Sequence, residues 1–533
     1  DYLAEYTLSY DKTIKDKHKF NALLGYTFQE TQYSILSGSR SGTFNYLIPV
    51  LNNAVFLPQN TSETNNYSQD DITSRFISYI GRLNYTYDNK VYFTGSIRKD
   101  GSSNFAPKNK FAIFPSFSVA WRLSEEKFIK NAGWISDLKL RTSFGYTGNP
   151  NVNPYSYLTR IDQGFQYPLG NSSGTEGANQ GAAPTAPSNP DIKWEKNEQL
   201  DIGIDAALFK SKLSVTIDYY QKRSKDLILY VVPINVSGNY VSVPYNTGTL
   251  QNRGIDLTIS GTILSSKNLN WNANLVMGTF TNNVITFGLG SSYNSGFARI
   301  NGGSLRTDIG YPANFFYGFQ TDGIFQTPEE IAKSATQTPG SDPSTSTAPG
   351  DIKFKDINSD GVIDDKDRTN LGNSFPQFTY GINNTISYKG FELRIFIQGS
   401  QGNKVLNFTR WYTEGGVSNG NYSKEVINRW SGPGTSNNMP RLILNDPNGN
   451  NRVSDRFVED ASYIRIKNVR LAYSLPDKWT KFAGLGRAQL YGSIQNLLTI
   501  TNYTGLDPEV GGGVDYGFYP QARTFLMGIT VDF

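Results

Sequence analysis

The chain contains no cysteine and only one histidine, His18. The absence of cysteine excludes disulfide bonds and thiolate metal sites. With a single histidine, the chain also has neither a cysteine–histidine catalytic pair nor a metal centre built from several histidines. His18 lies in a charged turn beside Lys15, Asp16 and Lys17, so we interpret it as a solvated residue and not as a catalytic base. The sequence therefore predicts no catalytic residue and no enzyme activity.

Long hydrophobic runs are missing as well. No stretch of eighteen apolar residues occurs, and the mean hydropathy is −0.44, which excludes a helical membrane protein. Aromatic residues nevertheless reach 14%, with 33 Tyr and 32 Phe, and 51 residues are glycine. This combination is typical of a transmembrane β-barrel, in which half of every strand faces water and aromatic residues collect at the membrane interfaces. A soluble all-β assembly is the alternative.

The distribution of charge and the first residues of the chain bear on nucleic-acid binding and on whether a preceding segment is missing. The net charge of +4 is spread over the sequence without a long basic run, so nucleic-acid binding is not expected. No signal peptide opens the chain, and Leu3, Tyr6, Leu8 and Tyr10 already form a strand-like pattern. We therefore expect that a preceding segment of the protein is missing from this chain.

Segments in which apolar and polar residues alternate recur along the whole chain. Ile202 and Ile204 alternate with Asp201 and Asp205, and a similar pattern surrounds Ile217. Comparable segments cover residues 77–87, 91–97, 111–121, 138–146, 255–263, 378–388 and 391–398. A period of two is that of a β-strand with one apolar and one polar face. The period alone does not separate a membrane barrel from a soluble sandwich, because both place polar residues on one face.

The lengths of the connections do separate these interpretations. Tight connections such as Asp88–Asn89, Ser211 and Lys389–Gly390 alternate with long ones such as Thr281–Ser374 and Lys404–Asp460. This alternation is typical of the periplasmic turns and extracellular loops of an outer-membrane barrel, and Greek-key sandwiches do not show it. The rule predicts about fifteen strands. Because bacterial barrels normally have an even number, we expect the chain to begin within the barrel.

Some local features depart from the regular pattern. Ile464 and Leu471 fall on opposite faces of the strand 463–473, which predicts a twist, a bulge or a strand buried on both faces. Two stretches, Gly170–Pro190 and Ser334–Gly350, contain few residues that form cores. They predict mobile loops.

The residues from Asp356 to Asp367 form an acidic loop with regularly spaced oxygen atoms. Oxygen-bearing side chains occupy positions 1, 3, 5, 9 and 12, and Gly361 occupies position 6. This is the spacing of a calcium loop, in which alternate oxygens converge on a hard cation and glycine permits the sharp turn. The predicted structural Ca²⁺ site comprises Asp356, Asn358, Asp360, the carbonyl of Val362, Asp364 and Asp367. The alternative is an Asp-rich turn whose carboxylates cap local backbone amides.

The same region carries a resemblance to a known family. After the acidic loop, the chain reads DRTNLGN, FPQFTYGINNTISYKGFEL and FIQGSQGN, and further similar runs are SFGYTGN and NVRLAYSLP. These runs resemble the SusC/RagA family, which are TonB-dependent outer-membrane transporters of Bacteroidota. The resemblance covers the C-terminal two-thirds of a barrel.

The resemblance implies an all-β fold, namely a transmembrane antiparallel β-barrel of about twenty-two strands with long extracellular loops. Residues 1–533 would form its C-terminal part, and the plug and the first strands would be absent from this chain. The implied function is TonB-dependent import of large nutrients, either oligosaccharides or peptides. A SusD-like surface lipoprotein would form the lid, the TonB complex would act through the missing plug, and outer-membrane lipid would surround the wall. No substrate-binding residue is assigned.

Two other functions remain open from the sequence. The chain could be a passive porin or adhesin-type barrel, which would lack an upstream plug domain. It could also be a soluble all-β glycan-binding protein, which would not need detergent for extraction.

Overall fold

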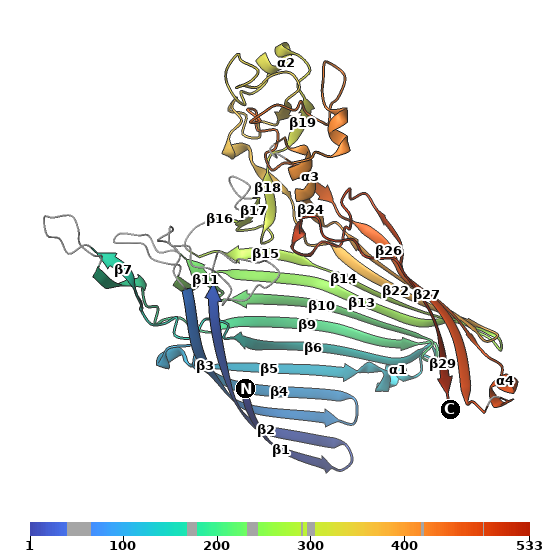
Figure 1. Ribbon diagram of the computed structural model, residues 1–533. Coiled ribbons are helices and arrows are strands. Elements are labelled where there is room, and N and C mark those ends of the chain that lie inside the picture. Colours follow the sequence, from blue (N-terminus) through green and yellow to red (C-terminus); the bar gives the residue numbers. More distant parts are fainter. Residues whose placement is uncertain are drawn as a thin grey trace. The chain divides into compact units, whose positions relative to one another are not determined.

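The computed structural model describes residues 1–39, 66–167, 179–231, 243–288, 292–295, 304–416, 420–482 and 484–533. Within these residues, one antiparallel sheet has a main path of fifteen strands (Figure 1). In order they are β1 (Tyr2–Ile14), β2 (His18–Ser39), β3 (Asn66–Tyr87), β4 (Val91–Ser102), β5 (Phe111–Arg122), β6 (Ile135–Asn149), β9 (Glu195–Leu208), β10 (Leu213–Lys225), β13 (Thr249–Ser265), β14 (Leu269–Thr279), β22 (Phe378–Tyr388), β23 (Phe391–Gln401), β26 (Tyr463–Ser474), β27 (Arg487–Thr501) and β29 (Thr524–Asp532). The all-β antiparallel architecture and the predicted number of strands are confirmed.

Helices are few and short. Among the described residues, the α-helices are α1 (Lys127–Lys130), α2 (Pro328–Ala332), α3 (Phe408–Glu414) and α4 (Asp477–Phe482). In the described part of the chain, none of the helices has the length and apolar character needed to span a membrane.

The chain divides into two compact units, which we describe separately. The first comprises Asp1–Val119, Ser143–Gln199 and Ser224–Gly248. Its β3–β4 connection is the predicted tight turn, with Asp88 and Asn89 at φ 50° and 53°, the left-handed conformation that asparagine and aspartate tolerate. Its largest apolar cluster surrounds Trp194, whose indole N–H donates to the carbonyl oxygen of Lys110 at 3.2 Å. The buried members of this cluster are Phe105, Phe114, Val152, Ile192 and Trp194.

The second unit comprises Ala120–Thr142, Leu200–Arg223 and Thr249–Phe533. Its strands β22 and β23 pair without a register shift, with Phe378 opposite Gln401 and Tyr388 opposite Phe391. Lys389 and Gly390 join these two strands with φ of 46° and 89°. Two positive φ values are the signature of the type I′ turn, which matches the twist of paired strands.

The strands of the second unit expose their apolar face. Ile202, Ile217 and Ile255 are 45%, 43% and 48% exposed, and Ile259 and Ile395 are half-buried. By contrast, Asp201 and Asp218, on the alternate positions, are partly enclosed and hydrogen-bonded. A soluble sheet buries its apolar face instead. The exposed apolar face therefore fits a wall that contacts hydrocarbon.

The strand β26 contains a bulge at the place where the sequence pattern changes phase. Against β23, Ile466 and Asn468 lie opposite the adjacent residues Ile397 and Phe396, so Lys467 is the extra residue in this pairing. The pairing with β27 shifts at the same place, but there Ile466 lies opposite Leu498 and Asn468 opposite Gln495, so the extra residue belongs to β27. Ile464 before the bulge and Leu471 after it are 40% and 52% exposed. The bulge thus returns both apolar segments to the same exposed face, and of the three predicted explanations it is the one that the structure confirms.

The three longest connections in the second unit fold into compact structure instead of free loops. They join β14 to β22, β23 to β26 and β27 to β29, and we call their described parts the loop body (residues 287–377, 402–462 and 502–523) (Figure 1, yellow to red). Its strands form separate small sheets. These are β16 (Ser292–Ser295), β17 (Leu305–Asp308), β18 (Phe315–Gly318) and β21 (Thr369–Gly372); β19 (Thr321–Ile324) and β20 (Ile352–Phe354); and β25 (Val458–Asp460), β24 (Lys404–Asn407) and β28 (Val514–Asp515).

The loop body has hydrophobic cores of its own. The largest cluster takes residues from all three connections, which are Phe316, Leu406, Phe408, Trp411, Val453, Phe457, Val458 and Val514. Ser334–Gly350 belongs to this body, and the structure differs here from the expected mobile loop. Ser346 is 1% exposed, and the Thr347 hydroxyl donates to Asn448 Oδ1 at 2.8 Å. Small polar residues can be ordered in this way when another connection supplies their hydrogen-bond partners.

The other stretch predicted to be mobile, Gly170–Pro190, lies partly outside the described residues. Its described part contains β8 (Asn179–Ala186), which pairs with β7 (Arg160–Tyr167).

Deleting Lys467 is a direct test of the bulge. Without the extra residue, the apolar residues on one side of position 467 must point to the polar face, because a slip of one residue inverts a strand. We expect the full chain to lose the folded form that migrates differently from the boiled form in SDS gels. Lys467→Ala keeps the residue count and should fold normally. Equal folding of the deletion and the substitution would contradict this role.

Candidate functional site

A cluster of charges lies on the polar face of adjacent strands in the second unit. We call Lys139, Arg141, Asp201, Asp205 and Asp218 the wall cluster. Arg141 contacts Asp201 Oδ1 and Asp205 Oδ2, each at 3.1 Å, and donates to Asp218 Oδ2 at 2.7 Å. Lys139 Nζ lies 3.0 Å from Asp205 Oδ2. One guanidinium thus joins three carboxylates from two neighbouring strands.

Strand alternation brings these residues together. Lys139 and Arg141 are two residues apart on β6, and Asp201 and Asp205 are four residues apart on β9, so each pair lies on one face. Asp218 on β10 completes the set. The predicted polar faces of these segments are therefore confirmed, but the pairing with Arg141 was missed. Opposite charges at polar-face positions of neighbouring strands were the signal that could have indicated it.

Gly203 provides the space in which this pairing occurs. It lies between Asp201 and Asp205 on the same face, and a Cβ atom there would lie 2.6 Å from Arg141 Cζ and overlap Asp218 Oδ1. The missing side chain lets the guanidinium cross β9 to reach Asp218. The cluster carries three acidic and two basic groups that are paired with one another, so it forms a charged surface.

Gly203→Ala is therefore expected to break the contact between Arg141 and Asp218. The loss should lower the stability of the full chain by about 1–3 kcal/mol, because the hydrogen bonds involve charged groups that are only partly exposed. Thermal unfolding in detergent measures this change. Gly492→Ala in β27 is the control, since a Cβ there has no neighbour closer than 4.0 Å. Equal melting temperatures of the two variants would contradict the role of Gly203.

A second set of charges holds the loop body together. Arg410 Nε lies 3.0 Å from Glu414 Oε1, and Arg410 Nη1 lies 2.7 Å from Glu459 Oε1. Burial would lower the pKa of Arg410, but these hydrogen bonds raise it above its ordinary value. Glu459 also accepts from the Thr504 amide at 2.9 Å. Two separate connections are thus joined by one charged network.

Arg456 is the least satisfied member of this region. Its Nη2 lies 3.4 Å from Glu414 Oε2, whereas its Nε and Nη1 have no hydrogen-bond partner among the described residues. Burial lowers the pKa of Arg456 to about 10. The guanidinium also stacks over the Phe457 ring, 4.8 Å from its centroid, and this contact partly offsets the cost of burying the charge.

A further buried ion pair links the connection 402–462 to the connection 287–377. The guanidinium of Arg441 binds both oxygens of Asp351, at 2.7 and 2.8 Å, and Asp351 is fully buried. The Asn450 side chain donates to the same carboxylate at 3.0 Å. A bidentate pair fixes both the distance and the relative orientation of the guanidinium and the carboxylate. The ion pair therefore holds together two segments that are about ninety residues apart in the sequence.

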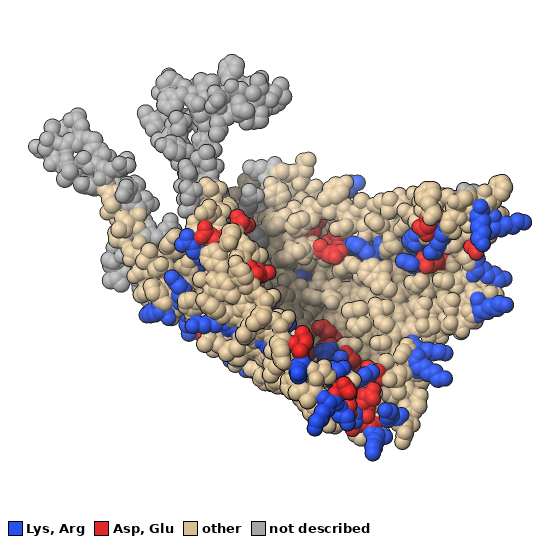
Figure 2. Space-filling view, turned by 90° about the horizontal axis from the view of Figure 1, so that it is seen from below, with Lys and Arg blue, Asp and Glu red and all other residues tan. Residues whose placement is uncertain are grey.

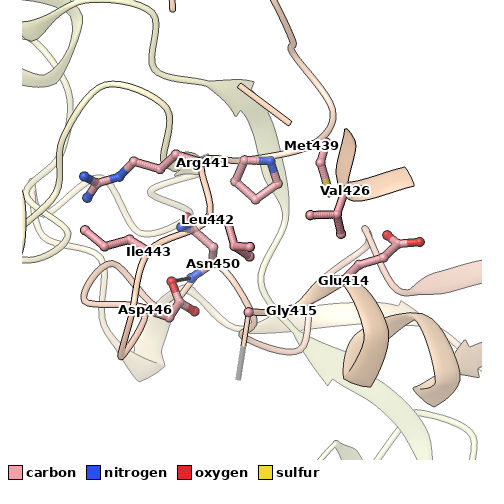
Figure 3. A pocket seen from close by; sticks show the side chains of 11 residues that line it. Glu414, Gly415, Val426, Met439, Arg441, Leu442, Ile443, Asp446 and Asn450 are labelled. Atoms are coloured by element: carbon pink, nitrogen blue, oxygen red, sulfur yellow. Dashed lines mark hydrogen bonds between the residues drawn. The ribbon is translucent and has the colours of Figure 1, made fainter. Parts of the chain in front are cut away.

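A narrow pocket lies beside these residues, between the end of α3 and residues 439–450 (Figure 3). Glu414, Val426, Met439, Leu442 and Asp446 contribute to its walls. Burial raises the pKa of Asp446, whose oxygens accept from the Asn450 and Asn451 amides at 2.9 Å. The carboxylates at this pocket are thus hydrogen-bonded to neighbouring parts of the fold, Glu414 to Arg410 and Asp446 to two backbone amides.

Arg465 ties the third connection to the wall. Its side chain is 2% exposed and extends from β26 to Asp507 at 2.7 Å, Glu509 at 2.8 Å and Thr499 at 2.8 Å. Nearby, the Tyr503 hydroxyl donates to Asp515 at 2.7 Å. Burial, together with this hydrogen bond, raises the pKa of Tyr503. The segment after β27 is therefore attached to β26 by the ion pairs of Arg465, and it is stabilised internally by the hydrogen bond between Tyr503 and Asp515.

The acidic loop adopts the predicted sharp turn, with Gly361 at φ 84°. Asp356 accepts from the amides of Ser359 and Gly361, at 2.7 and 2.8 Å. Asp367 is buried and accepts from the amides of Ile357 and Asp364, each at 2.8 Å. Asp364 caps Lys366 at 2.8 Å. The carboxylates thus make the local amide contacts of the alternative interpretation.

The same loop bears on the predicted Ca²⁺ site. The hydrogen bond from the Val362 amide, followed by that from Asn358, lowers the pKa of Asp360 and favours its charged form. Among the described residues, no group of three or more Asp, Glu, His or Cys side chains is arranged to hold a metal ion. Calcium binding at Asp356, Asn358, Asp360, Val362, Asp364 and Asp367 stays a prediction.

Calorimetric titration of the full chain with calcium tests this prediction. Binding in the millimolar range or tighter is expected if the loop acts as a calcium loop, and Asp360→Asn should weaken it by removing a charged ligand. Asp342→Asn, in another exposed turn, is the control. No heat of binding at millimolar calcium would contradict the prediction.

Comparison with known proteins agrees with this architecture. The chain matches the family model described as TonB dependent receptor-like, beta-barrel, over residues 2–497. It is 33% identical to TonB-dependent receptor P3 of Formosa agariphila, across 100% of this chain and 52% of the relative. It is 30% identical to TonB-dependent receptor SusC of Bacteroides thetaiotaomicron, across 86% of this chain and 44% of the relative.

A solved structure is also similar. The structure described as that of the RagAB peptide transporter superposes with a TM-score of 0.80 and 26% identity, and covers 99% of this chain and 55% of that chain. The chain thus spans about half the length of these relatives. Their names are those of receptors and transporters, in agreement with the prediction that the chain is not an enzyme.

Proposed function

Since this chain belongs to the TonB-dependent receptors, as an outer-membrane barrel region of the SusC/RagA type, we propose that it forms part of an importer for large nutrients, either oligosaccharides or peptides. The observation that carries the proposal is the arrangement of the two faces of the strands. Ile202 and Ile217 are exposed on the apolar face, whereas Arg141 and its carboxylate partners are partly enclosed on the other. The apolar face contacts lipid, and the charged face lines a hydrated passage.

The loop body supplies the second part of the proposal. A platform of folded loops at one end of a barrel offers a fixed surface, and its buried pairs, such as Arg441–Asp351, keep that surface in one shape. We propose that this surface receives a SusD-like surface lipoprotein that acts as the lid. The TonB complex supplies the energy through a plug, which these residues do not contain.

The substrate class follows from the relatives only as a proposal. The RagAB structure is described as a peptide transporter, and its identity to this chain, 26%, is close to the 30% shared with the SusC protein. Both peptides and oligosaccharides are large and polar, which suits a hydrated passage lined by charged groups. A passive barrel remains the second candidate, because the wall cluster would serve a diffusion pore equally well.

The proposal is tested in cells that carry the full protein. Labelled oligosaccharides or peptides should accumulate only while the proton-motive force is intact, and a lipoprotein should purify with the protein in detergent. Uptake that continues without TonB would favour the passive barrel. Extraction of the protein by salt alone, without detergent, would contradict a membrane location.

A further inference from the structure

The short turns of the second unit are rich in lysine. We call residues 124–134, 209–212, 266–268, 389–390, 475–482 and 484–486 the turn edge, because these turns connect the strands at the end opposite to the loop body. These residues include eight lysines and three acidic residues. The lysines are Lys127, Lys130, Lys210, Lys212, Lys267, Lys389, Lys478 and Lys481. Figure 2 shows Lys and Arg side chains gathered along the right-hand edge of the molecule, where the short turns lie in Figure 1.

These lysines are mostly without acidic partners. In the part of the chain that the structure describes, Lys210, Lys267 and Lys478 form no ion pair, and all are exposed. Lys130 lies 3.7 Å from Glu125, and the Lys389 ammonium lies 5.4 Å from the centroid of the Tyr388 ring. In the loop body, three lysines lie close to carboxylates: Lys353 is 2.9 Å from Asp322, Lys366 is 3.6 Å from Asp364, and Lys404 is 3.4 Å from Asp460. The positive charge of the turn edge is therefore available to a partner.

Exposed aromatic side chains accompany the lysines. Phe128 and Phe482 are 70% and 95% exposed, and Trp479 is 60% exposed between Lys478 and Lys481. Trp134 and Phe209 belong to different turns, and their ring centroids lie 6.4 Å apart. Large aromatic rings that are exposed to water are unfavourable, because apolar surface is stabilised when it is removed from water. The ammonium groups beside them, in contrast, are stable only in a polar environment. Together they suit a boundary at which hydrocarbon meets charged groups.

We propose that the turn edge binds the phosphate head groups of an anionic phospholipid leaflet. The rings enter the boundary region, and the lysines reach from the same turns to the phosphates, which attract each ammonium near the surface. The turn edge also continues the apolar face of the strands, through residues such as Leu490, which is 47% exposed. This continuity favours lipid over a protein partner, because a surface that follows the whole strand edge matches a leaflet and not a compact domain.

The inference rests on the proposed function, since it requires the strands to span a bilayer. It goes further by naming the chemistry of the lipid on the turn side. The full chain is to be purified in mixed micelles of phosphatidylglycerol and phosphatidylcholine, and the lipids that remain bound are to be counted by native mass spectrometry. The variant K212Q/K478Q/K481Q removes three turn lysines, and K333Q/K355Q/K424Q removes three exposed lysines of the loop body as the matched control.

We expect the unsubstituted chain to retain phosphatidylglycerol over phosphatidylcholine, and the turn variant to lose about tenfold or more of this preference. The loop variant should keep it. High salt should weaken the preference, because the contacts are made at the water boundary. Inorganic phosphate should not compete, since it lacks the acyl chains that place the rings.

Three results would overturn the inference. They are equal retention of the two lipids, an equal loss in both variants, and lysine-dependent capture of an acidic periplasmic protein in place of lipid. These results leave the importer proposal standing. A chain that does not enter micelles or bilayers at all would overturn both.

Discussion

The structure depends on strands that expose an apolar face and enclose a charged one. In water, exposed isoleucines along successive strands would be costly, because apolar surface is stabilised by removal from water. Contact with hydrocarbon removes this cost on one side of each strand only. The charged residues on the other side must therefore be paired with one another or hydrated. The contacts of Arg141 with Asp201, Asp205 and Asp218 do this within the sheet. A lipid environment thus explains both the exposed apolar residues and the paired charges.

Register is the second consequence of this constraint. When one face must meet lipid along the entire strand, a change of phase in the sequence has to be corrected locally. The bulge at Lys467 performs this correction against β23, and the pairing with β27 shifts at the same position through an extra residue on β27. The polar face is constrained in a similar way at Gly203. Because this residue has no side chain, the Arg141 guanidinium can extend from β6 across β9 to Asp218 on β10.

The loop body follows different rules, those of a small soluble domain. Its cores are buried in the ordinary way, around Phe316, Phe457 and Trp411. Its buried charges are paired, and removing one partner of such a pair leaves an uncompensated charge in a low dielectric, which typically costs about 3–5 kcal/mol. Among the described residues, two nitrogen atoms of Arg456 have no hydrogen-bond partner, so the compensation of this charge is incomplete. The loop body therefore has a hydrophobic core and paired charges of its own.

The sequence by itself determined the strands, the order of short and long connections, the change of phase around Lys467 and the family, because alternation and turn residues act over a few neighbouring positions. It also indicated the polar faces that hold Asp201 and Asp205. It did not predict that Ser334–Gly350 is packed, nor that Arg141, Arg441 and Arg465 each join segments that are far apart. These outcomes depend on partners supplied by other connections, such as Asn448 for Thr347 and Asp351 for Arg441. Only the tertiary structure decides such contacts, because a local pattern shows which face a residue occupies but not which distant residue lies opposite.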